Sequence, residues 1–244
     1  MTISYGTSPY AIRDDLVEGH RRVWDRLANA GTWLDGATRV QVAAEARHAR
    51  GCPLCTQQKD ALSPFAIDGQ HDTLGELSEK RIELIHRVVA DPGRLTRSWS
   101  EQLRAGGMDD TDYVEIVSII AHVTAIDTFA RALGLEEQPL PAPRAGAPSH
   151  YRPAEARQGE AWLPNIAWDE VGSNEADFCK GRESSIRRAL TLVPDEARSF
   201  FDLVSHQYLP GEAMQEFTKK IRAITRAQIE LLAGRVSALN RCTY

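Results

Sequence analysis

The sequence predicts an all-α protein, and three observations lead to that prediction. Apolar residues recur at three- and four-residue steps over most of the chain, which is the spacing of an amphipathic helix. Residues typical of helix ends delimit these segments, such as Asp109 and Asp110 before one and Gly134 after it. No segment combines strand-like alternation with the turn residues of a hairpin.

The first half of the chain contains six predicted helices. Ala11–Leu27 has its apolar residues at helical spacing, and Asp35–Arg50 repeats the pattern with alanines that favour close packing. Gly51 should end that helix, and Pro53 suits the first turn of the next, where a missing N–H costs nothing. Ser-Pro, Asp-Pro-Gly and Gly-Gly sequences set the later boundaries. These boundaries give helices at about Pro53–Leu62, Leu77–Ala90, Arg94–Leu103 and Tyr113–Leu133.

A proline-rich stretch predicts a linker in the middle of the chain. Residues 136–153 contain five prolines and almost no large aliphatic side chains, a composition typical of a semi-rigid spacer. We therefore expect an N-terminal helical domain (1–136), a linker (137–160) and a C-terminal helical region (161–244). The C-terminal region has helical periodicity at Ser184–Leu192, Pro194–Tyr208 and Gly211–Asn240.

The composition argues against several classes of partner. Of the 244 residues, 42% are hydrophobic and 26% charged, which is typical of a soluble globular protein. The formal charge of −5 is spread without long runs of one sign, so nucleic acid is not an expected partner. No stretch approaches the about 18 uncharged apolar residues of a membrane span, and no signal-like segment opens the chain. We expect no membrane association and a cytoplasmic location.

The cysteines are the first candidates for chemistry. Cys52 and Cys55 form a C-x-x-C pair, whereas Cys179 and Cys242 are isolated, a pattern too sparse for a secreted disulfide framework. Cys52 should cap the helix that begins at Pro53, where free backbone N–H groups and the helix dipole favour a thiolate. Cys55 lies one turn further and could convert a sulfenic acid into a disulfide. The spacing alone leaves open which cysteine attacks.

Three polar residues could serve these thiols. Glu45 and His48 precede Cys52 by seven and four residues, and Lys59 follows it by seven, which keeps the side chains on one side of a helix. His48 titrates near neutral pH and could manage protons together with Glu45. We therefore predict Cys52, Cys55, Glu45 and His48 as catalytic and Lys59 as a secondary candidate, although solvated charges on a helix would give the same spacing.

The chain resembles the alkylhydroperoxidase D-like and carboxymuconolactone decarboxylase superfamily. The resemblance lies in the C-x-x-C that opens a helix after an Ala-rich helix, and in residues 78–134, where a Gly-containing loop precedes a D-x-x-x-V-E-I-V helix. Residues 225–244 are similar to the segment that leads into the family's cysteine motif. The resemblance implies an all-helical bundle, usually oligomeric, whose dithiol reduces peroxides with a nearby glutamate and histidine as proton relay.

The first copy of this motif departs from the family pattern. That pattern has a glutamate twelve residues before the first cysteine and a histidine four residues after the second. These positions hold Val40 and Lys59 here, so Glu45 and His48 are substitutes proposed on spacing.

The second copy has the opposite departure. Glu230 and Cys242 match the pattern, but the sequence ends at Tyr244, before the position of a second cysteine. Residues 39–52 and 229–242 are therefore interpreted as two divergent copies of one repeat, with chance similarity between two amphipathic helices as the alternative.

The expected function is that of a thiol peroxidase-like (peroxiredoxin-type) oxidoreductase that forms homo-oligomers. Its substrate would be a hydroperoxide, and a dithiol protein or small dithiol would regenerate it, with no bound cofactor or metal. Zinc would need two more ligands, of which only His48 is close in sequence. A non-catalytic self-association or binding module and a decarboxylase-like small-molecule enzyme remain alternatives. Secondary candidates are Glu115, His122, Glu230 and Cys242, and for His122 a satisfied core histidine is the simpler interpretation.

Overall fold

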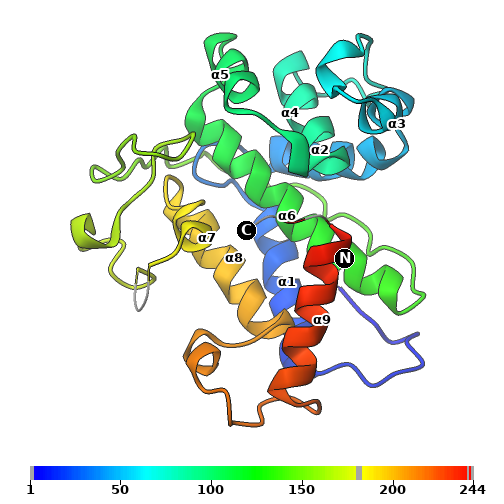
Figure 1. Cartoon of the computed structure of the whole chain (residues 1–244), viewed down its shortest axis with the longest axis vertical. Helices are drawn as coiled ribbons and strands as arrows, with labels where there is room; N and C mark the ends of the chain where they lie inside the picture. Colours follow the sequence, from blue (N-terminus) through cyan, green and yellow to red (C-terminus); the bar gives the residue numbers. More distant parts are fainter. Residues whose placement is uncertain (1–2, 180–182, 241, 243–244) are drawn as a thin grey trace. The chain divides into compact units, whose positions relative to one another are not determined.

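The all-α prediction is confirmed by the computed structural model, which describes residues 3–179, 183–240 and 242. Over those residues the regular elements are helices, and the β-type pairing is a single antiparallel bridge between Arg157 and Asn165 (Figure 1). The chain forms two compact units, Met1–Leu203 and Val204–Tyr244. The three-part division at a proline-rich linker stays a prediction.

Helix α6 (Asp110–Ala132) is the centre of the first unit. It packs against α1 (Asp14–Ala28), α2 (Gly36–His48) and α4 (Glu79–Ala90), and its apolar side chains form much of the core (Figure 1). By length and composition α6 could span a membrane, but 67% of its apolar window is buried inside the protein. A core helix has this character because it is covered on several sides.

The cysteine helix begins as the sequence predicts. Helix α2 ends at His48, a 3₁₀ turn follows at Ala49–Gly51, and α3 (Pro53–Asp60) starts with Cys52 at its N-cap and Pro53 in its first turn. At the other end of α3, Arg94 donates hydrogen bonds to the carbonyl oxygens of Gln58 (3.0 Å), Lys59 (2.7 Å) and Ala61 (2.7 Å). The guanidinium thus satisfies carbonyls that have no partner within the helix.

Side-chain caps move two predicted helix starts. Helix α5 is Arg97–Ala105 rather than Arg94–Leu103, because the Thr96 side chain accepts a hydrogen bond from Trp99 N at 3.2 Å and so begins the helix there. Residues 211–240 do not form one helix: a 3₁₀ turn at Gly211–Gln215 precedes α9 (Arg226–Leu239) in the second unit. Thr225 and Gln228 form a reciprocal capping box, which starts α9 as a separate helix.

The predicted helix Ser184–Leu192 is also wrong. Only Ser185–Arg188 is helical (α7), because the Thr191 hydroxyl donates to Arg188 O (2.8 Å) and accepts from Ile166 N (2.9 Å). Such a side chain offers the backbone an alternative to the helical pattern. Helix α8 (Pro194–Gln207) agrees with the predicted Pro194–Tyr208 within one residue.

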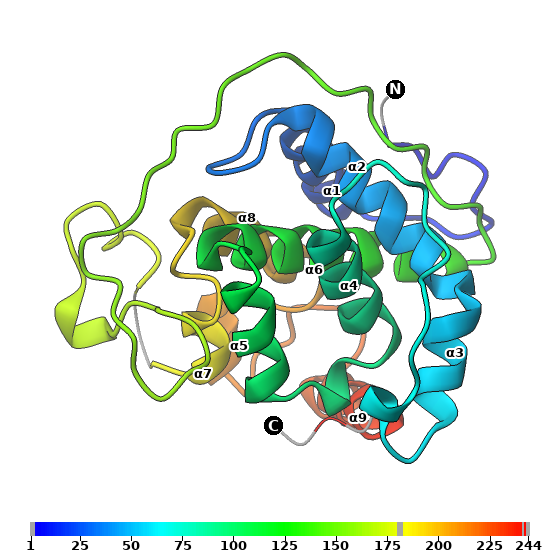
Figure 2. The same ribbon diagram turned by 90° about the horizontal axis from the view of Figure 1, so that it is seen from above.

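The proline-rich segment is extended and lies along the N-terminal helices (Figure 2). Pro139 O accepts a hydrogen bond from the indole of Trp24 at 2.8 Å, and Arg144 N donates to Ala28 O at 2.7 Å. His150 N donates to Thr32 O at 2.8 Å. These bonds give the segment backbone partners even though it has no helix of its own.

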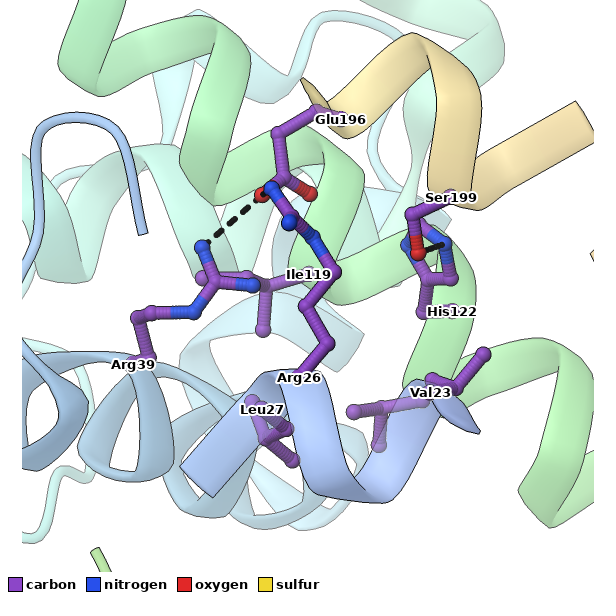
Figure 3. A pocket seen from close by; sticks show the side chains of 9 residues that line it. Val23, Arg26, Leu27, Arg39, Ile119, His122, Glu196 and Ser199 are labelled. Atoms are coloured by element: carbon purple, nitrogen blue, oxygen red, sulfur yellow. Dashed lines mark hydrogen bonds and ion pairs between the residues drawn. The ribbon is translucent and has the colours of Figure 1, made fainter. Parts of the chain in front are cut away.

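A buried ion network connects α2, α6 and α8. Arg39, 2% exposed, contacts the carboxylate of Glu115 through its guanidinium. The same guanidinium lies 2.9 Å from Glu196, and Arg26 lies 2.7 Å from Glu196 (Figure 3). Burial would raise the pKa of Glu196, but Arg39 and Arg26 together hold it well below its usual range. A cavity of about 10 Å³ beside this network has room for about one water molecule.

Replacing the shared carboxylate should unfold this network. We expect Glu196→Gln to lower the free energy of unfolding by about 3–5 kcal/mol, because Arg26 loses its buried counter-charge and Arg39 keeps only that of Glu115. Urea denaturation followed by circular dichroism measures the change. Glu18→Gln, which breaks an exposed pair with Arg21, is the matched control and should cost less than about 1 kcal/mol. Equal losses in the two variants would contradict the network's structural role.

Candidate functional site

Cys52 lies at the N-terminus of α3 with its thiol fully buried. Its backbone is extended (φ −66°, ψ 121°), and its carbonyl accepts the first helical hydrogen bond, from Thr56 N at 3.2 Å. Burial would raise the pKa of Cys52. Hydrogen bonds from the backbone N–H of Cys55, from His71 and from the backbone N–H of Asp72 outweigh that effect and lower the pKa below its ordinary value.

The pKa of the Cys55 thiol is shifted in the opposite direction. Cys55 is 3% exposed, and burial followed by its hydrogen bond to Cys52 raises the pKa of its thiol to about 12. Its Sγ lies 3.3 Å from Nδ1 of His86 on α4. The two sulfurs are therefore electronically different, since a thiolate is favoured on Cys52 and a protonated thiol on Cys55.

His86 is held by a buried carboxylate. Its Nε2 lies 2.8 Å from Oε1 of Glu45 on α2, and the other oxygen of Glu45 accepts a hydrogen bond from Leu74 N at 3.1 Å. Burial lowers the pKa of His86 more than Glu45 raises it, so the imidazole is neutral near pH 7. Because Nε2 faces a carboxylate it carries the proton, which leaves Nδ1 free to accept one from Cys55.

His71 provides a second imidazole from the segment between α3 and α4. Its Nε2 lies 2.9 Å from Glu83, whose other oxygen accepts from the indole of Trp99 at 2.9 Å. Burial would lower the pKa of His71, but the hydrogen bonds to Glu83 and Cys52 raise it overall. Its Nδ1 lies 3.7 Å from Sγ of Cys52 and 3.5 Å from Sγ of Cys55.

These four residues form what we call the thiol–imidazole cluster: Cys52, Cys55, His71 and His86. Their two sulfurs and two Nδ1 atoms all lie within 4.8 Å of one another, a grouping that could hold a metal ion. Each imidazole has a carboxylate on its far nitrogen. The arrangement is suited to proton exchange with sulfur and to metal coordination.

Of the predicted relay pair, only Glu45 reaches the cluster, and it does so through His86. His48 lies at the end of α2, with its Nε2 3.3 Å from a carboxylate oxygen of Asp72. The spacing keeps side chains together only along one helical axis, and the break expected at Gly51 is present as a 3₁₀ turn at 49–51 that separates α2 from α3. Lys59 is exposed in the last turn of α3.

The candidates on α6 belong to the buried ion network. Glu115 contacts Arg39 and accepts a hydrogen bond from Trp33 N at 2.8 Å, and burial followed by Glu196 raises its pKa. His122 is 4% exposed and lies 3.0 Å from the Ser199 hydroxyl, as Figure 3 shows. Its Nδ1 lies 2.7 Å from a backbone carbonyl, and burial lowers its pKa.

The candidates near the C-terminus lie in the second unit. Glu230 on α9 contacts Arg226 at 2.8 Å and the Tyr208 hydroxyl at 2.5 Å, and Cys242 is exposed. Residues 241, 243 and 244 of the second motif copy lie outside the described residues. A functional role for Glu230 and Cys242 stays a prediction.

Sequence reasoning missed His71, His86 and Glu83. His86 lies in a helix that the apolar pattern predicts, where a histidine is easily interpreted as an ordinary core residue. His71 lies in a segment without periodicity. The sequence did contain one signal. Both histidines follow the C-x-x-C pair in the chain, and a zinc site with two cysteines commonly takes its other two ligands from histidines downstream.

The comparisons with known proteins add no relative. No protein-family model, no curated protein and no solved structure matches this chain.

Substitutions at Glu45 should show how tightly its carboxylate is held. We expect Glu45→Leu to lower the free energy of unfolding by about 2–4 kcal/mol, because His86 and Leu74 N keep buried donors without an acceptor. Glu45→Gln retains one acceptor oxygen and should lose about half as much. Urea denaturation in the presence of a metal chelator measures both. Losses below about 0.5 kcal/mol in both variants would contradict the buried hydrogen bonds.

Proposed function

We propose that this chain is a thiol peroxidase-like oxidoreductase related to the alkylhydroperoxidase D-like superfamily. One observation carries the proposal: each sulfur lies against an imidazole that is backed by a carboxylate. His71 and Glu83 stand beside Cys52, and Glu45 reaches Cys55 through His86. Two adjacent thiols, each with its own proton partner, are what a dithiol cycle needs.

In the first step, Cys52 attacks the peroxide. The thiolate of Cys52 takes the terminal oxygen of the hydroperoxide ROOH, the O–O bond breaks, and Cys52 becomes a sulfenic acid. The leaving alkoxide takes a proton and departs as the alcohol ROH. Protonated His71, held by Glu83, is the donor within reach, since its Nδ1 lies beside both sulfurs. The sulfur is oxidised by two electrons and the peroxide is reduced by two.

In the second step, Cys55 resolves the sulfenic acid. Its thiol proton passes to Nδ1 of neutral His86, which lies 3.3 Å from the sulfur. The resulting thiolate attacks the Cys52 sulfur, the S–O bond breaks, and the leaving hydroxide takes up the proton that His86 received, so that it departs as water. Glu45 stabilises the imidazolium formed on His86, because it accepts a hydrogen bond from the far nitrogen. The product is a Cys52–Cys55 disulfide.

A dithiol completes the cycle. A reductant of the dihydrolipoyl or thioredoxin class gives two electrons and two protons to the disulfide and becomes a disulfide itself. The proposal includes a homo-oligomer and a reducing compartment, the cytoplasm, in which Cys52 and Cys55 start as thiols. It includes no bound cofactor.

The burial of the sulfurs sets a condition on the first step. Cys52 is 0% and Cys55 3% exposed, so a peroxide reaches them only when the covering structure opens locally. The segment between α3 and α4 is the evident cover, because it places His71 against both sulfurs (Figure 2).

The same burial favours a second candidate function. A non-catalytic helical module for self-association or partner binding would keep its thiols sealed, and its cluster would only stabilise the fold. A decarboxylase-like enzyme has less support. The cavity beside Arg39 and Glu196 has a volume of only about 10 Å³, and the pocket of about 540 Å³ along α1, lined by Glu18, Arg21, Arg22, Asp25, Arg26, Asn29 and Ala30, contains no member of the thiol–imidazole cluster.

Peroxide assays on cysteine variants test the proposal. With tert-butyl hydroperoxide, a chelator and dithiothreitol as reductant, the wild-type protein should consume peroxide and oxidise one dithiothreitol per peroxide; without the reductant it should consume one equivalent and lose two of its own thiols. Cys52→Ser should reduce consumption to the uncatalysed rate, because the attacking sulfur is gone. Without added reductant, Cys55→Ser should consume one equivalent of peroxide and stop with a sulfenic acid on Cys52, which dimedone traps for mass spectrometry.

Cys179→Ser is the matched control, because Cys179 is an isolated thiol outside the cluster, and it should behave as wild type. Unreactive thiols in the folded wild-type protein would refute the peroxidase proposal and support the non-catalytic module. Peroxide turnover that survives the double variant Cys52→Ser/Cys55→Ser would refute it as well.

A further inference from the structure

We propose that the thiol–imidazole cluster is a zinc site, in which Cys52, Cys55, His71 and His86 bind one Zn²⁺ ion when the cysteines are reduced. This inference goes beyond the peroxidase function and does not depend on it. It rests on the type, number and placement of the ligand atoms.

The atom spacing agrees with tetrahedral zinc. Zn–S bonds of about 2.3 Å and Zn–N bonds of about 2.0–2.1 Å at tetrahedral angles put sulfur and nitrogen about 3.6 Å apart. Three of the four Sγ–Nδ1 distances are 3.3, 3.5 and 3.7 Å, and all four ligand atoms lie within 4.8 Å of one another. A four-ligand set of this spacing can surround one ion.

The imidazoles have the orientation and tautomer of metal ligands. Both turn Nδ1 to the sulfurs and Nε2 to a carboxylate, Glu83 for His71 and Glu45 for His86. The carboxylate keeps a proton on Nε2, so His86, whose pKa is lowered, has a lone pair on Nδ1, and His71 gives up its Nδ1 proton when the metal binds. A carboxylate behind a histidine ligand is the usual outer support of zinc sites, because it fixes the ring and raises its basicity.

The ligand chemistry selects zinc over the common hard cations. Two thiolates and two imidazoles suit Zn²⁺, whereas Mg²⁺ and Ca²⁺ require oxygen ligands. The set has four protein ligands and is nearly closed to solvent, since Cys52, Cys55 and His86 are buried. Such closed four-ligand sites are structural sites, in which metal binding stabilises the fold.

Zinc and the peroxidase cycle would compete for the same two sulfurs. A bound ion occupies both thiolates, so the loaded chain is protected from oxidation, and a Cys52–Cys55 disulfide cannot coordinate it. The proposed peroxidase is therefore the metal-free form.

Direct measurements on the full-length protein test the zinc site. The reduced wild-type chain, titrated with Zn²⁺ and then freed of excess, should retain one zinc per chain by elemental analysis. X-ray absorption at the zinc edge should show two sulfur and two nitrogen neighbours at about 2.3 and 2.0–2.1 Å. Co²⁺ in place of zinc should give the intense visible absorption of a tetrahedral site with thiolate ligands. Neighbours that are all oxygen or nitrogen, or no retained zinc, would overturn the proposal.

Variants assign the ligands. Cys52→Ser and His71→Ala should lose the Co²⁺ spectrum, while Cys179→Ser, the matched control, should keep it. Glu83→Ala should weaken zinc binding about 10–100-fold but leave the coordination unchanged, because it supports His71 and does not touch the metal. An unaltered Co²⁺ spectrum in Cys52→Ser would overturn the assignment.

The two proposals can fail separately. Zinc retained in a protein that never consumes peroxide in the presence of chelator supports the zinc site and refutes the peroxidase. Peroxide consumption by a protein that retains no zinc supports the peroxidase and refutes the zinc site.

Discussion

The hydrogen bond between Glu45 and His86 is the interaction on which the rest of the site depends. It joins α2 to α4 in the interior, at 2.8 Å, and fixes the proton of His86 on Nε2. The other nitrogen must then face Cys55 as an acceptor. Through Leu74 N the same carboxylate also anchors the segment that brings His71 to the sulfurs. The Glu45 side chain thus positions His86, and through it Cys55, as well as the segment that carries His71. Removing this side chain should therefore disturb all three.

Both proposals, the peroxidase and the zinc site, depend on the same arrangement of imidazoles around the two sulfurs. A proton partner and a metal ligand make the same geometric demand on an imidazole, namely that Nδ1 face the sulfurs and that a carboxylate stand behind the ring. What differs is the occupant of the space between the four atoms of the thiol–imidazole cluster. A proton leaves the sulfurs free to exchange electrons, whereas a divalent ion binds them as a pair. The metal supply and redox state around the protein would therefore decide which chemistry is expressed.

The sequence predicted what local rules control and missed what long-range packing controls. The start of α3 at Pro53 follows from one turn of chain, and the structure places it there. The partner of Cys55 could not be found in this way, because His86 comes from another helix and meets the thiol only when α2, α3 and α4 pack together. His48 shows the converse error. Its spacing is correct for a continuous helix, but the 3₁₀ turn before Cys52 ends that continuity.

Side chains of three neighbouring helices hold the segment 67–77: Gln58 of α3 donates to Ile67 O at 3.1 Å, Glu45 of α2 accepts from Leu74 N at 3.1 Å, and Glu83 of α4 lies 2.9 Å from His71. It contributes His71, which like the N-cap residue Cys52 lies outside a helix, and it covers sulfurs that have almost no exposed surface. Figure 2 shows the course of this segment between α3 and α4. The kinetics of any sulfur reagent are then gated. At high reagent concentration the labelling rate reaches a plateau equal to the frequency with which this segment lifts, and the intrinsic nucleophilicity of the thiolate no longer determines it.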